Sequence, residues 1–359
     1  MAPGSLETTT TTTTAPVDLA ALARWMDAAG LEAGPVTVLE RLPGGTQNLM
    51  LRLRRGGREF VLRQSPPSPV LDGNRTMRRE ARLLAALAGT DVPHPRLVAL
   101  CDDPALLGGV FYLMEVVRGF NATTGLPPLH AGDPAVRHAM SLALVDGIAS
   151  LAAVDPVAVG LGDFGRLEGF LARQAGRWRS QLEGYRQYMG WPGPQALPEV
   201  EAVGAWLDAH LPAAFRPGLM HGDYHIGNVM FAPDGPALAA IVDWELATLG
   251  DPLLDLGRLL AQWPEGGAPP PGGYRIAPHD GLPDMPEMIA HYAARTGRDL
   301  APLRWHAVLA SYKLGILLEG SHARAFAGKA PRETGETLHQ TAIECLQRAA
   351  AWIEGGPFA

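Results

Sequence analysis

One stretch of the chain, residues 219–231 (LMHGDYHIGNVMF), constrains the fold more than any other. Its apolar end, Val229–Phe231, is followed by a second short apolar run, Ala239–Val242. A Pro-Asp-Gly turn at residues 233–235 lies between the two runs. Short apolar runs on either side of such a turn predict a β-hairpin.

Three polar side chains sit at the open ends of this hairpin. Asp223 and Asn228 precede it, and Asp243 follows it. Because a hairpin brings its two ends together, we expect these side chains to converge on one small volume. Phosphoryl transfer needs such a set: one carboxylate orients a hydroxyl, while an amide oxygen and a second carboxylate hold Mg²⁺ on ATP. We therefore predict Asp223 as the catalytic residue and Asn228 and Asp243 as metal ligands.

The ordered motifs resemble those of a known family. His-Gly-Asp at 221–223, followed by Asn228, matches the His-Gly-Asp-x-x-x-x-Asn signature of the aminoglycoside phosphotransferase family. Asp-Trp-Glu at 243–245 stands where protein kinases carry Asp-Phe-Gly. The resemblance implies a two-lobed, protein-kinase-like α+β fold. The small lobe would combine an antiparallel sheet with a helix, and the large lobe would be mostly helical.

The chain divides accordingly into three predicted segments. Residues 1–16, which include a threonine run, are expected to be a disordered tail. Residues 17–118 would form the N-terminal nucleotide-binding lobe, with three strands of an antiparallel meander between residues 36 and 64. Residues 119–359 would form the C-terminal catalytic and acceptor-binding lobe.

The predicted small lobe contains candidate nucleotide-binding residues. The turn Gly44-Gly45-Thr46 lies where a kinase-like fold covers the phosphates, although such a turn also serves as a simple hairpin connection. Val61 and Arg63 share one face of a strand, and Arg63 stands where the kinase pattern has its phosphate-pairing lysine. Arginine keeps the positive charge but not the geometry of lysine. The alternative is an exposed arginine at the end of a strand.

The resemblance implies two further features of the nucleotide site. Glu80, on a predicted helix, would form an ion pair with Arg63, the alternative being an ordinary surface glutamate. Backbone groups of Glu115 and Val117 would contact adenine at the hinge between the lobes.

In the predicted large lobe, two residues would support the catalytic loop. Asp255 lies inside an otherwise apolar helix, where a buried carboxylate needs partners. The resemblance implies that it accepts hydrogen bonds from backbone near His221, and that His221 anchors the loop. His225 has no predicted role beyond packing. The polar residues of 311–313 and 319–324 are either acceptor-site residues or salt bridges at the edge of the core.

Composition narrows the class of partner and compartment. Thirty basic against 37 acidic residues give a net charge of −7, which argues against non-specific nucleic-acid binding. Two cysteines, Cys101 and Cys345, cannot make a disulfide scaffold and favour a reducing interior. We expect no apolar run as long as a membrane span, no signal peptide, no membrane partner and a cytoplasmic location. The sequence carries no signal for the oligomeric state.

Together these features predict an ATP- and Mg²⁺-dependent phosphotransferase acting on a hydroxyl of a small molecule. Similarity to the branch associated with acyl-CoA dehydrogenases favours a hydroxyacyl compound or its CoA thioester as acceptor. An aminoglycoside, a macrolide and a choline-like alcohol remain alternatives. Two rival classes are a metallohydrolase, with His221, Asp223 and His225 on one metal, and a non-catalytic pseudokinase, because Arg63 replaces lysine.

Overall fold

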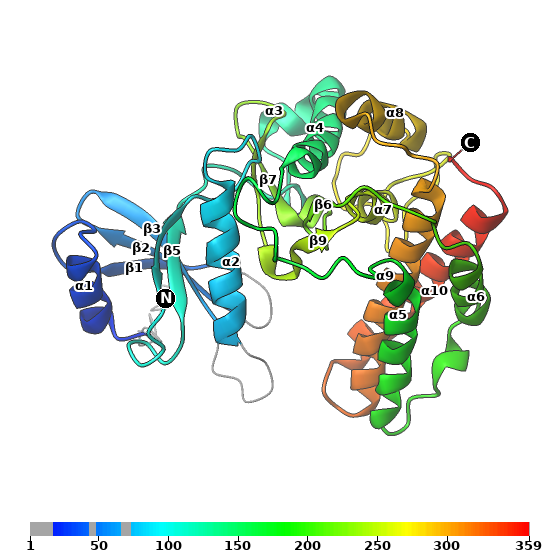
Figure 1. Cartoon of the computed structure of the whole chain (residues 1–359), viewed down its shortest axis with the longest axis horizontal. Coiled ribbons are helices and arrows are strands. Elements are labelled where there is room, and N and C mark those ends of the chain that lie inside the picture. Colours follow the sequence, from blue (N-terminus) through cyan, green and yellow to red (C-terminus); the bar gives the residue numbers. More distant parts are fainter. Residues whose placement is uncertain (1–16, 43–47, 66–72, 359) are drawn as a thin grey trace, which may run out of the picture. The chain divides into compact units, whose positions relative to one another are not determined.

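The computed structural model describes residues 17–42, 48–65 and 73–358. The predicted tail at 1–16 and the Gly44-Gly45-Thr46 turn lie outside these residues. The chain divides into two compact units (Figure 1). Unit 1 holds the described residues up to Ala85 and Pro95–Val116, and unit 2 holds Ala86–His94 and Val117–Ala359.

Unit 1 is built on a five-stranded antiparallel sheet with the strand order β1-β2-β3-β5-β4. A turn at Gly56, whose φ of 56° suits glycine, joins the second and third strands. The predicted antiparallel meander is confirmed. The strands are β1 (Thr37–Arg41), β2 (Leu49–Arg55), β3 (Arg58–Gln64), β4 (Leu97–Cys101) and β5 (Phe111–Glu115).

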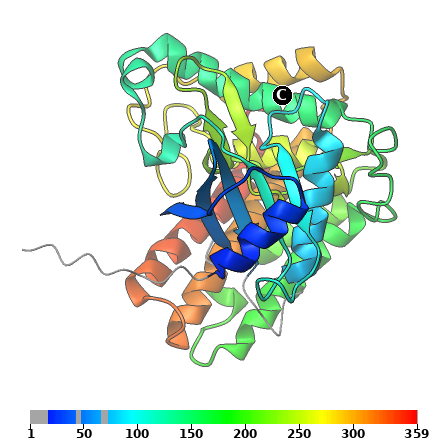
Figure 2. The same cartoon turned by 90° about the vertical axis from the view of Figure 1, so that its left-hand side faces the viewer.

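Two helices, α1 (Leu19–Ala28) and α2 (Gly73–Leu87), cover opposite faces of this sheet (Figures 1 and 2). Side chains alternate between the faces of a strand, so neighbours on β3 point in opposite directions. Phe60 and Leu62 belong to the core cluster that includes residues of α1. Arg63 points to the other face, where α2 lies.

The ion pair expected between Arg63 and Glu80 is present. Arg63 Nε lies 2.9 Å from Glu80 Oε2, and both side chains are almost fully buried. The Tyr112 hydroxyl donates a hydrogen bond of 2.7 Å to the same carboxylate oxygen. A buried charge is tolerated when a partner of opposite charge and hydrogen bonds compensate it, so this group ties α2 to the sheet.

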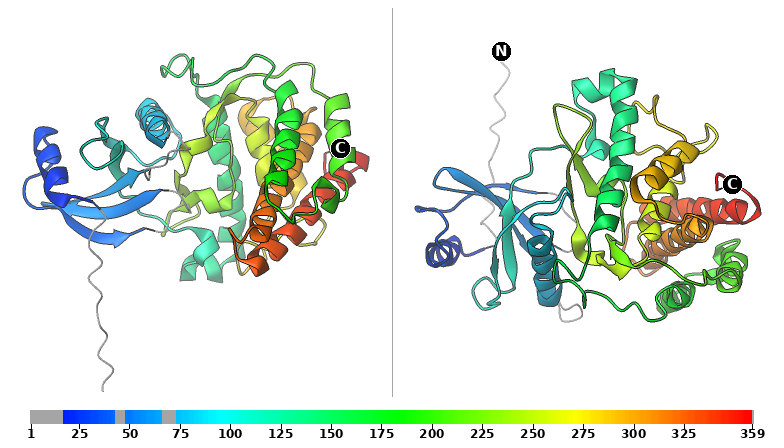
Figure 3. Two further views of the ribbon diagram at one scale, coloured as in Figure 1. Left: turned by 90° about the horizontal axis from the view of Figure 1, so that it is seen from below. Right: turned by 45° about the horizontal axis from the view of Figure 1, so that its top comes forward.

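Unit 2 is mostly helical (Figure 3). The last two helices, α9 and α10, are joined by a short connection and pack side by side. The helices are α3 (Pro128–Gly132), α4 (Pro134–Ala153), α5 (Ala172–Gly184), α6 (Val200–Ala209), α7 (Leu253–Leu260), α8 (Met285–Thr296), α9 (Leu303–Phe326) and α10 (Arg332–Glu354).

Two short strand pairs complete unit 2. Strands β7 (Val229–Phe231) and β8 (Leu238–Ile241) pair antiparallel, which confirms the predicted hairpin. Strand β6 (Gly218–Met220), which precedes the 221–228 loop, pairs antiparallel with β9 (Thr248–Gly250).

The stretch 167–188 is rich in arginine and glutamine, and by its sequence we expect one long helix there; this expectation is wrong. Helix α5 begins only at Ala172, and a separate 3₁₀ turn follows at Tyr185–Gln187. Gly169 has a φ of 57°, a left-handed conformation that cannot continue a right-handed helix. The Arg- and Gln-rich composition therefore indicated helix correctly but not where it starts.

Helix α4 is the one helix among the described residues that bears on the expectation about membrane spans. By length and composition alone it could cross a membrane. However, 56% of its most apolar window is buried inside the protein. Core helices of soluble proteins pass the same test, and the buried residues of α4 include Arg137, whose guanidinium donates to the backbone of His130 and Ala131.

The Arg63–Glu80 pair generates a stability prediction. Arg63→Met removes the cation beside a buried carboxylate, so the free energy of unfolding should fall by about 3–5 kcal/mol. Arg58→Met is the matched control, because Arg58 on the same strand pairs with the half-exposed Glu115 and should change stability by less than about 1 kcal/mol. Urea denaturation of both variants measures the difference. Equal losses in the free energy of unfolding would contradict the conclusion that the Arg63–Glu80 pair stabilises unit 1.

Candidate active site

The 221–228 loop is fixed to helix α7 by one carboxylate. Asp255 Oδ2 accepts a hydrogen bond from the His221 N–H at 2.6 Å, and Oδ1 accepts one from the Gly222 N–H at 2.9 Å. Asp255 is fully buried, and burial raises its pKa. The hydrogen bonds expected between Asp255 and the backbone near His221 are therefore present.

The His221 ring holds the loop from its other side. Its Nε2 lies 2.9 Å from the Val242 carbonyl, and its Nδ1 accepts from the Asp223 N–H at 3.3 Å. This pattern requires the neutral tautomer with the proton on Nε2. Burial lowers the pKa of His221, which favours that neutral form. His221 thus anchors the loop to the strand end beside it.

Only glycine fits between His221 and Asp223. Gly222 has a φ of 86°. A Cβ placed there would lie 2.5 Å from the Leu246 carbonyl oxygen. The Gly222 carbonyl in turn accepts a 2.6 Å hydrogen bond from Lys313 Nζ on α9. Glycine at position 222 is therefore required by the close packing of this loop.

The β7–β8 hairpin brings Asn228 beside the residue that precedes Asp243. The Val242 N–H donates to the Asn228 carbonyl at 2.9 Å. The Asn228 side-chain amide donates to the Asp223 carbonyl at 3.0 Å, so one side chain spans the loop from end to end. Asp223, Asn228 and Asp243 consequently belong to one local arrangement.

Asp243 adopts a left-handed conformation, with φ 67° and ψ 63°. Such a conformation is uncommon for residues other than glycine, although aspartate tolerates it better than most. It persists only where the surroundings fix it, and such positions cluster at functional sites. The buried Trp244 provides one fixed neighbour, because its Nε1 donates to the Ile241 carbonyl at 3.0 Å.

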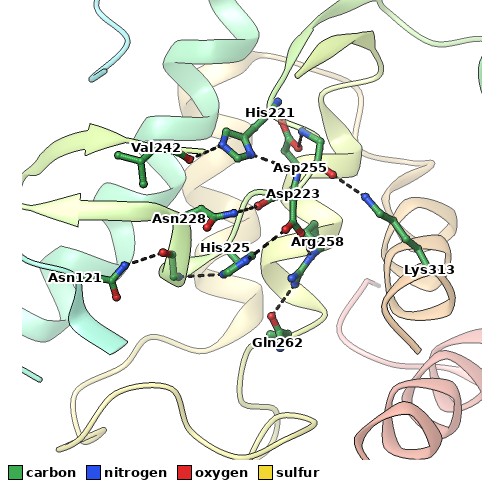
Figure 4. A network of polar contacts seen from close by, with 12 residues as sticks. Asn121, His221, Asp223, His225, Asn228, Val242, Asp255, Arg258, Gln262 and Lys313 are labelled. Carbon is green, nitrogen blue, oxygen red and sulfur yellow. Dashed lines mark hydrogen bonds and ion pairs between the residues drawn. The ribbon is translucent and has the colours of Figure 1, made fainter. Parts of the chain in front are cut away.

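The Asp223 carboxylate is held by Arg258 and lies beside His225 (Figure 4). Arg258 Nε donates to Asp223 Oδ1 at 2.8 Å, and Arg258 is itself buried. His225 Nε2 lies 3.6 Å from Asp223 Oδ2. Burial alone would raise the pKa of Asp223, but His225, Arg258 and Lys313 outweigh it and hold the pKa well below its usual range. Asp223 is therefore ionised at neutral pH.

Sequence reasoning missed Arg258 and left Lys313 undecided. Arg258 follows Asp255 by three residues on α7, a spacing that places two side chains on one helix face. Two charged residues one turn apart in an otherwise apolar helix could have indicated that Arg258 faces the same loop as Asp255. Lys313 is 55 residues further along the chain, so only the packing of α9 brings it to Gly222.

The predicted alternative metal triad is not assembled. His221 directs both ring nitrogens at its own loop and the adjacent strand end. The His225 Nδ1 accepts from the Gly227 N–H at 3.0 Å. Within residues 17–42, 48–65 and 73–358, the one group of His, Cys, Asp and Glu side chains close enough to hold a metal lies elsewhere, at Glu319, His322 and His339. This finding removes the main support for a metallohydrolase.

The other predicted nucleotide-binding residues lie in or next to the sheet of unit 1. Val61 is buried on β3 beside Arg63. The Glu115 N–H already donates to the Arg96 carbonyl at 2.9 Å, which leaves its carbonyl as the group that could face a ligand. Val117 begins the main segment of unit 2. The roles assigned to these residues stay predictions.

The Asp255 contacts generate a second prediction. Asp255→Asn leaves one acceptor oxygen for two backbone donors, so the free energy of unfolding should fall by about 1–3 kcal/mol. Asp208→Asn is the control, because Asp208 is an exposed carboxylate paired with Arg179 and should matter by less than about 1 kcal/mol. Urea denaturation compares them. Equal stability of the Asp255 variant and the unmodified protein would show that the loop needs no such anchor.

Comparison with known proteins places this chain in a family. Residues 38–306 match the model of the phosphotransferase enzyme family. The chain is 30% identical to acyl-CoA dehydrogenase family member 10 of Mus musculus over 309 residues, covering 84% of this chain and 28% of that protein. It is 28% identical to family member 11 of Rattus norvegicus over 337 residues, covering 90% of this chain and 42% of that protein. The chain spans less than half the length of these curated relatives.

Solved structures agree. A protein of Ralstonia eutropha, described as a candidate aminoglycoside phosphotransferase, is 30% identical with a TM-score of 0.76, covering 93% of this chain and 99% of that one. Aminoglycoside phosphotransferase APH(4)-Ia, solved with AMP-PNP and hygromycin B, is 15% identical with a TM-score of 0.55, covering 89% and 98%. That second likeness shows the fold alone, and it confirms the predicted kinase-like α+β class. Since the family model matches most of its length, the chain belongs to the phosphotransferase enzyme family.

Proposed function

We propose that this chain is a small-molecule kinase that moves the γ-phosphate of ATP to an acceptor hydroxyl. The observation that carries the proposal is the local convergence of Asp223, Asn228 and Asp243 on the loop and hairpin of unit 2. Catalysis of phosphoryl transfer consists mostly of positioning and of neutralising charge. The site has parts for both tasks.

Asp223 would accept a hydrogen bond from the acceptor hydroxyl and orient it toward the phosphate. Its strongly lowered pKa makes it a weak base. This suits a loose transition state, in which little negative charge develops on the nucleophile and early proton removal is unnecessary. Arg258 would keep the carboxylate ionised and in place.

Mg²⁺ prefers oxygen ligands, and the residues present fit that preference. The Asn228 amide nitrogen is engaged with the Asp223 carbonyl, which directs Asn228 Oδ1 away from that carbonyl. Asp243, fixed by its left-handed backbone, would supply a carboxylate oxygen. When bound, the metal would neutralise charge on the nucleotide phosphates.

In unit 1, Arg63 would contact the nucleotide phosphates while Glu80 holds its guanidinium in place. A guanidinium offers a flat, forked donor where lysine offers a point charge. Val61 would pack near the nucleotide, and the Glu115 and Val117 backbones would face adenine. The Gly44-Gly45-Thr46 turn would cover the phosphates.

The charges around Asp223 favour an anionic acceptor. Two cations, Arg258 and Lys313, lower the pKa of Asp223. A third cation, Arg275, lowers the pKa of the neighbouring His225. A polycationic aminoglycoside or a choline-like alcohol needs carboxylates at this place instead, because like charges repel. We therefore propose a hydroxyacyl compound, as the free acid or its CoA thioester, as acceptor. The names of the curated relatives agree with an acyl substrate.

The role of Asp223 is tested by Asp223→Asn. The rate of ADP release with acceptor present should fall by about 10²–10⁴-fold. The variant should still unfold cooperatively, at a lower temperature than the unmodified protein, because the buried Arg258 loses its carboxylate partner. Asp208→Asn should keep full activity, because Asp208 lies on the exposed side of α6. Undiminished ATP turnover by Asp223→Asn would contradict the catalytic role of Asp223, and absence of turnover in the unmodified protein with every acceptor would favour the pseudokinase alternative.

Lys313 gives the acceptor proposal a pH test. Burial lowers the pKa of Lys313 to about 8, although Asp223 opposes this. The side chain is therefore cationic below that pH and neutral above it. We expect the KM for an anionic hydroxyacyl acceptor to rise as the pH passes through about 8. Lys313→Arg should remove this rise, because arginine stays charged.

One control and one substrate panel complete this test. The KM for ATP should change little over the same pH range. A panel of hydroxyacyl-CoAs, free hydroxy acids, aminoglycosides and amino alcohols should show turnover with the anionic compounds. Turnover confined to cationic compounds would overturn the acceptor assignment without touching the assignment of Asp223.

A further inference from the structure

A second cluster of titratable side chains lies apart from the 221–228 loop, on α9 and α10. Glu319 is fully buried in α9. His322 Nδ1 lies 3.0 Å from Glu319 Oε1, and His339 Nδ1 lies 2.6 Å from Glu319 Oε2. Trp191 Nε1 donates to Oε1 at 2.6 Å. The kinase assignment uses none of these residues.

The charge of Glu319 is offset by hydrogen bonds from ring nitrogens and not by a lysine or an arginine. A carboxylate removed from water this completely is costly unless a cation or several hydrogen bonds offset it. Among the described residues, no lysine or arginine lies within 4.0 Å of Glu319; the groups that reach it are two imidazoles and one indole. The two imidazole rings stack with centroids 4.1 Å apart, so both stand on the same side of the cluster, next to the carboxylate.

The geometry presents three ligand atoms to one point. The Glu-x-x-His spacing puts Glu319 and His322 on one face of α9, and His339 comes from the adjacent α10. The three ligand atoms lie within 4.8 Å of one another. A metal ion with bonds of about 2.0–2.2 Å to nitrogen and oxygen fits such a group, since it would replace the two Nδ1 protons.

We propose that Glu319, His322 and His339 form a binding site for a first-row transition metal ion, with Zn²⁺ as the first candidate. Two imidazoles and one carboxylate make a ligand set known for zinc and for non-haem iron. Mg²⁺ and Ca²⁺ prefer sites made of oxygen, so the cluster differs in kind from the Asn228 and Asp243 pair. The bound ion would join α9 to α10 next to Trp191, whose indole N–H contacts Glu319.

The site also has a route to solvent and a link to the rest of α9. The His339 side chain is 22% exposed and that of His322 is 11% exposed, so an ion can reach them from one side. Lys313 lies on α9 six residues before Glu319, which corresponds to roughly 9 Å along the helix axis. Metal binding would therefore stiffen the helix that carries Lys313 to the 221–228 loop.

Zinc titration of the full chain tests the site. The protein is produced without a polyhistidine tag, stripped of metal, and titrated with Zn²⁺ against a chromogenic chelator. We expect one tight equivalent per chain. Replacing His339 with glutamine (His339→Gln) should weaken zinc binding by at least about 10–100-fold. The control is His210→Gln, which replaces an exposed histidine stacked on Trp206 and should leave zinc binding unchanged. Co²⁺ in place of Zn²⁺ should give visible absorption bands in the unmodified protein only.

Thermal unfolding supplies a readout that is independent of kinase activity. Zn²⁺ should raise the Tm of the unmodified protein, because a ligand that binds the folded state stabilises it. The same addition should have little effect on His339→Gln or on His322→Gln, each of which must first melt cooperatively without metal. Absence of tight binding in the unmodified protein, or equal binding in His339→Gln, would overturn the proposal.

Discussion

The arrangement of unit 2 depends on one carboxylate, Asp255, which accepts hydrogen bonds from two successive backbone N–H groups. These bonds fix the turn that leads into Asp223, and the second donor, Gly222, lets the chain pass Leu246 closely because it has no Cβ. A backbone donor buried without a partner is costly, so the loop has few other conformations open to it. The position of Asp223 follows from this constraint.

Electrostatics then decides what Asp223 can do. Burial would favour its neutral form, yet the neighbouring Arg258, Lys313 and His225 keep it ionised. A carboxylate held this way orients a partner better than it removes a proton. Two of these neighbours, Arg258 and Lys313, are cations, and they make the surroundings of Asp223 unlike a pocket for a polycation. One set of charges thus bears on both the chemistry and the class of acceptor.

Unit 2 contains two polar centres of different chemistry, one at the 221–228 loop and the β7–β8 hairpin and the other on helices α9 and α10. The first, around Asn228 and Asp243, offers oxygen atoms, and the second, around Glu319, offers imidazole nitrogens. Hard cations such as Mg²⁺ prefer sites made of oxygen, whereas transition metals such as Zn²⁺ also bind imidazole nitrogen, so the two centres would bind different ions. Helix α9 contributes Lys313 to the first centre and Glu319 to the second, so its packing against α10 affects both.

The sequence by itself determined the hairpin, the antiparallel meander and the family, because each depends on local periodicity or on a motif of fixed spacing. The resemblance to that family implied the Arg63–Glu80 pair. It misjudged the start of α5, since a single left-handed glycine set that boundary. Only the tertiary structure revealed Arg258 and Lys313 beside Asp223, and the meeting of Glu319 and His322 with His339. These contacts join residues whose separation along the chain carries no pattern, and helix packing alone brings them together.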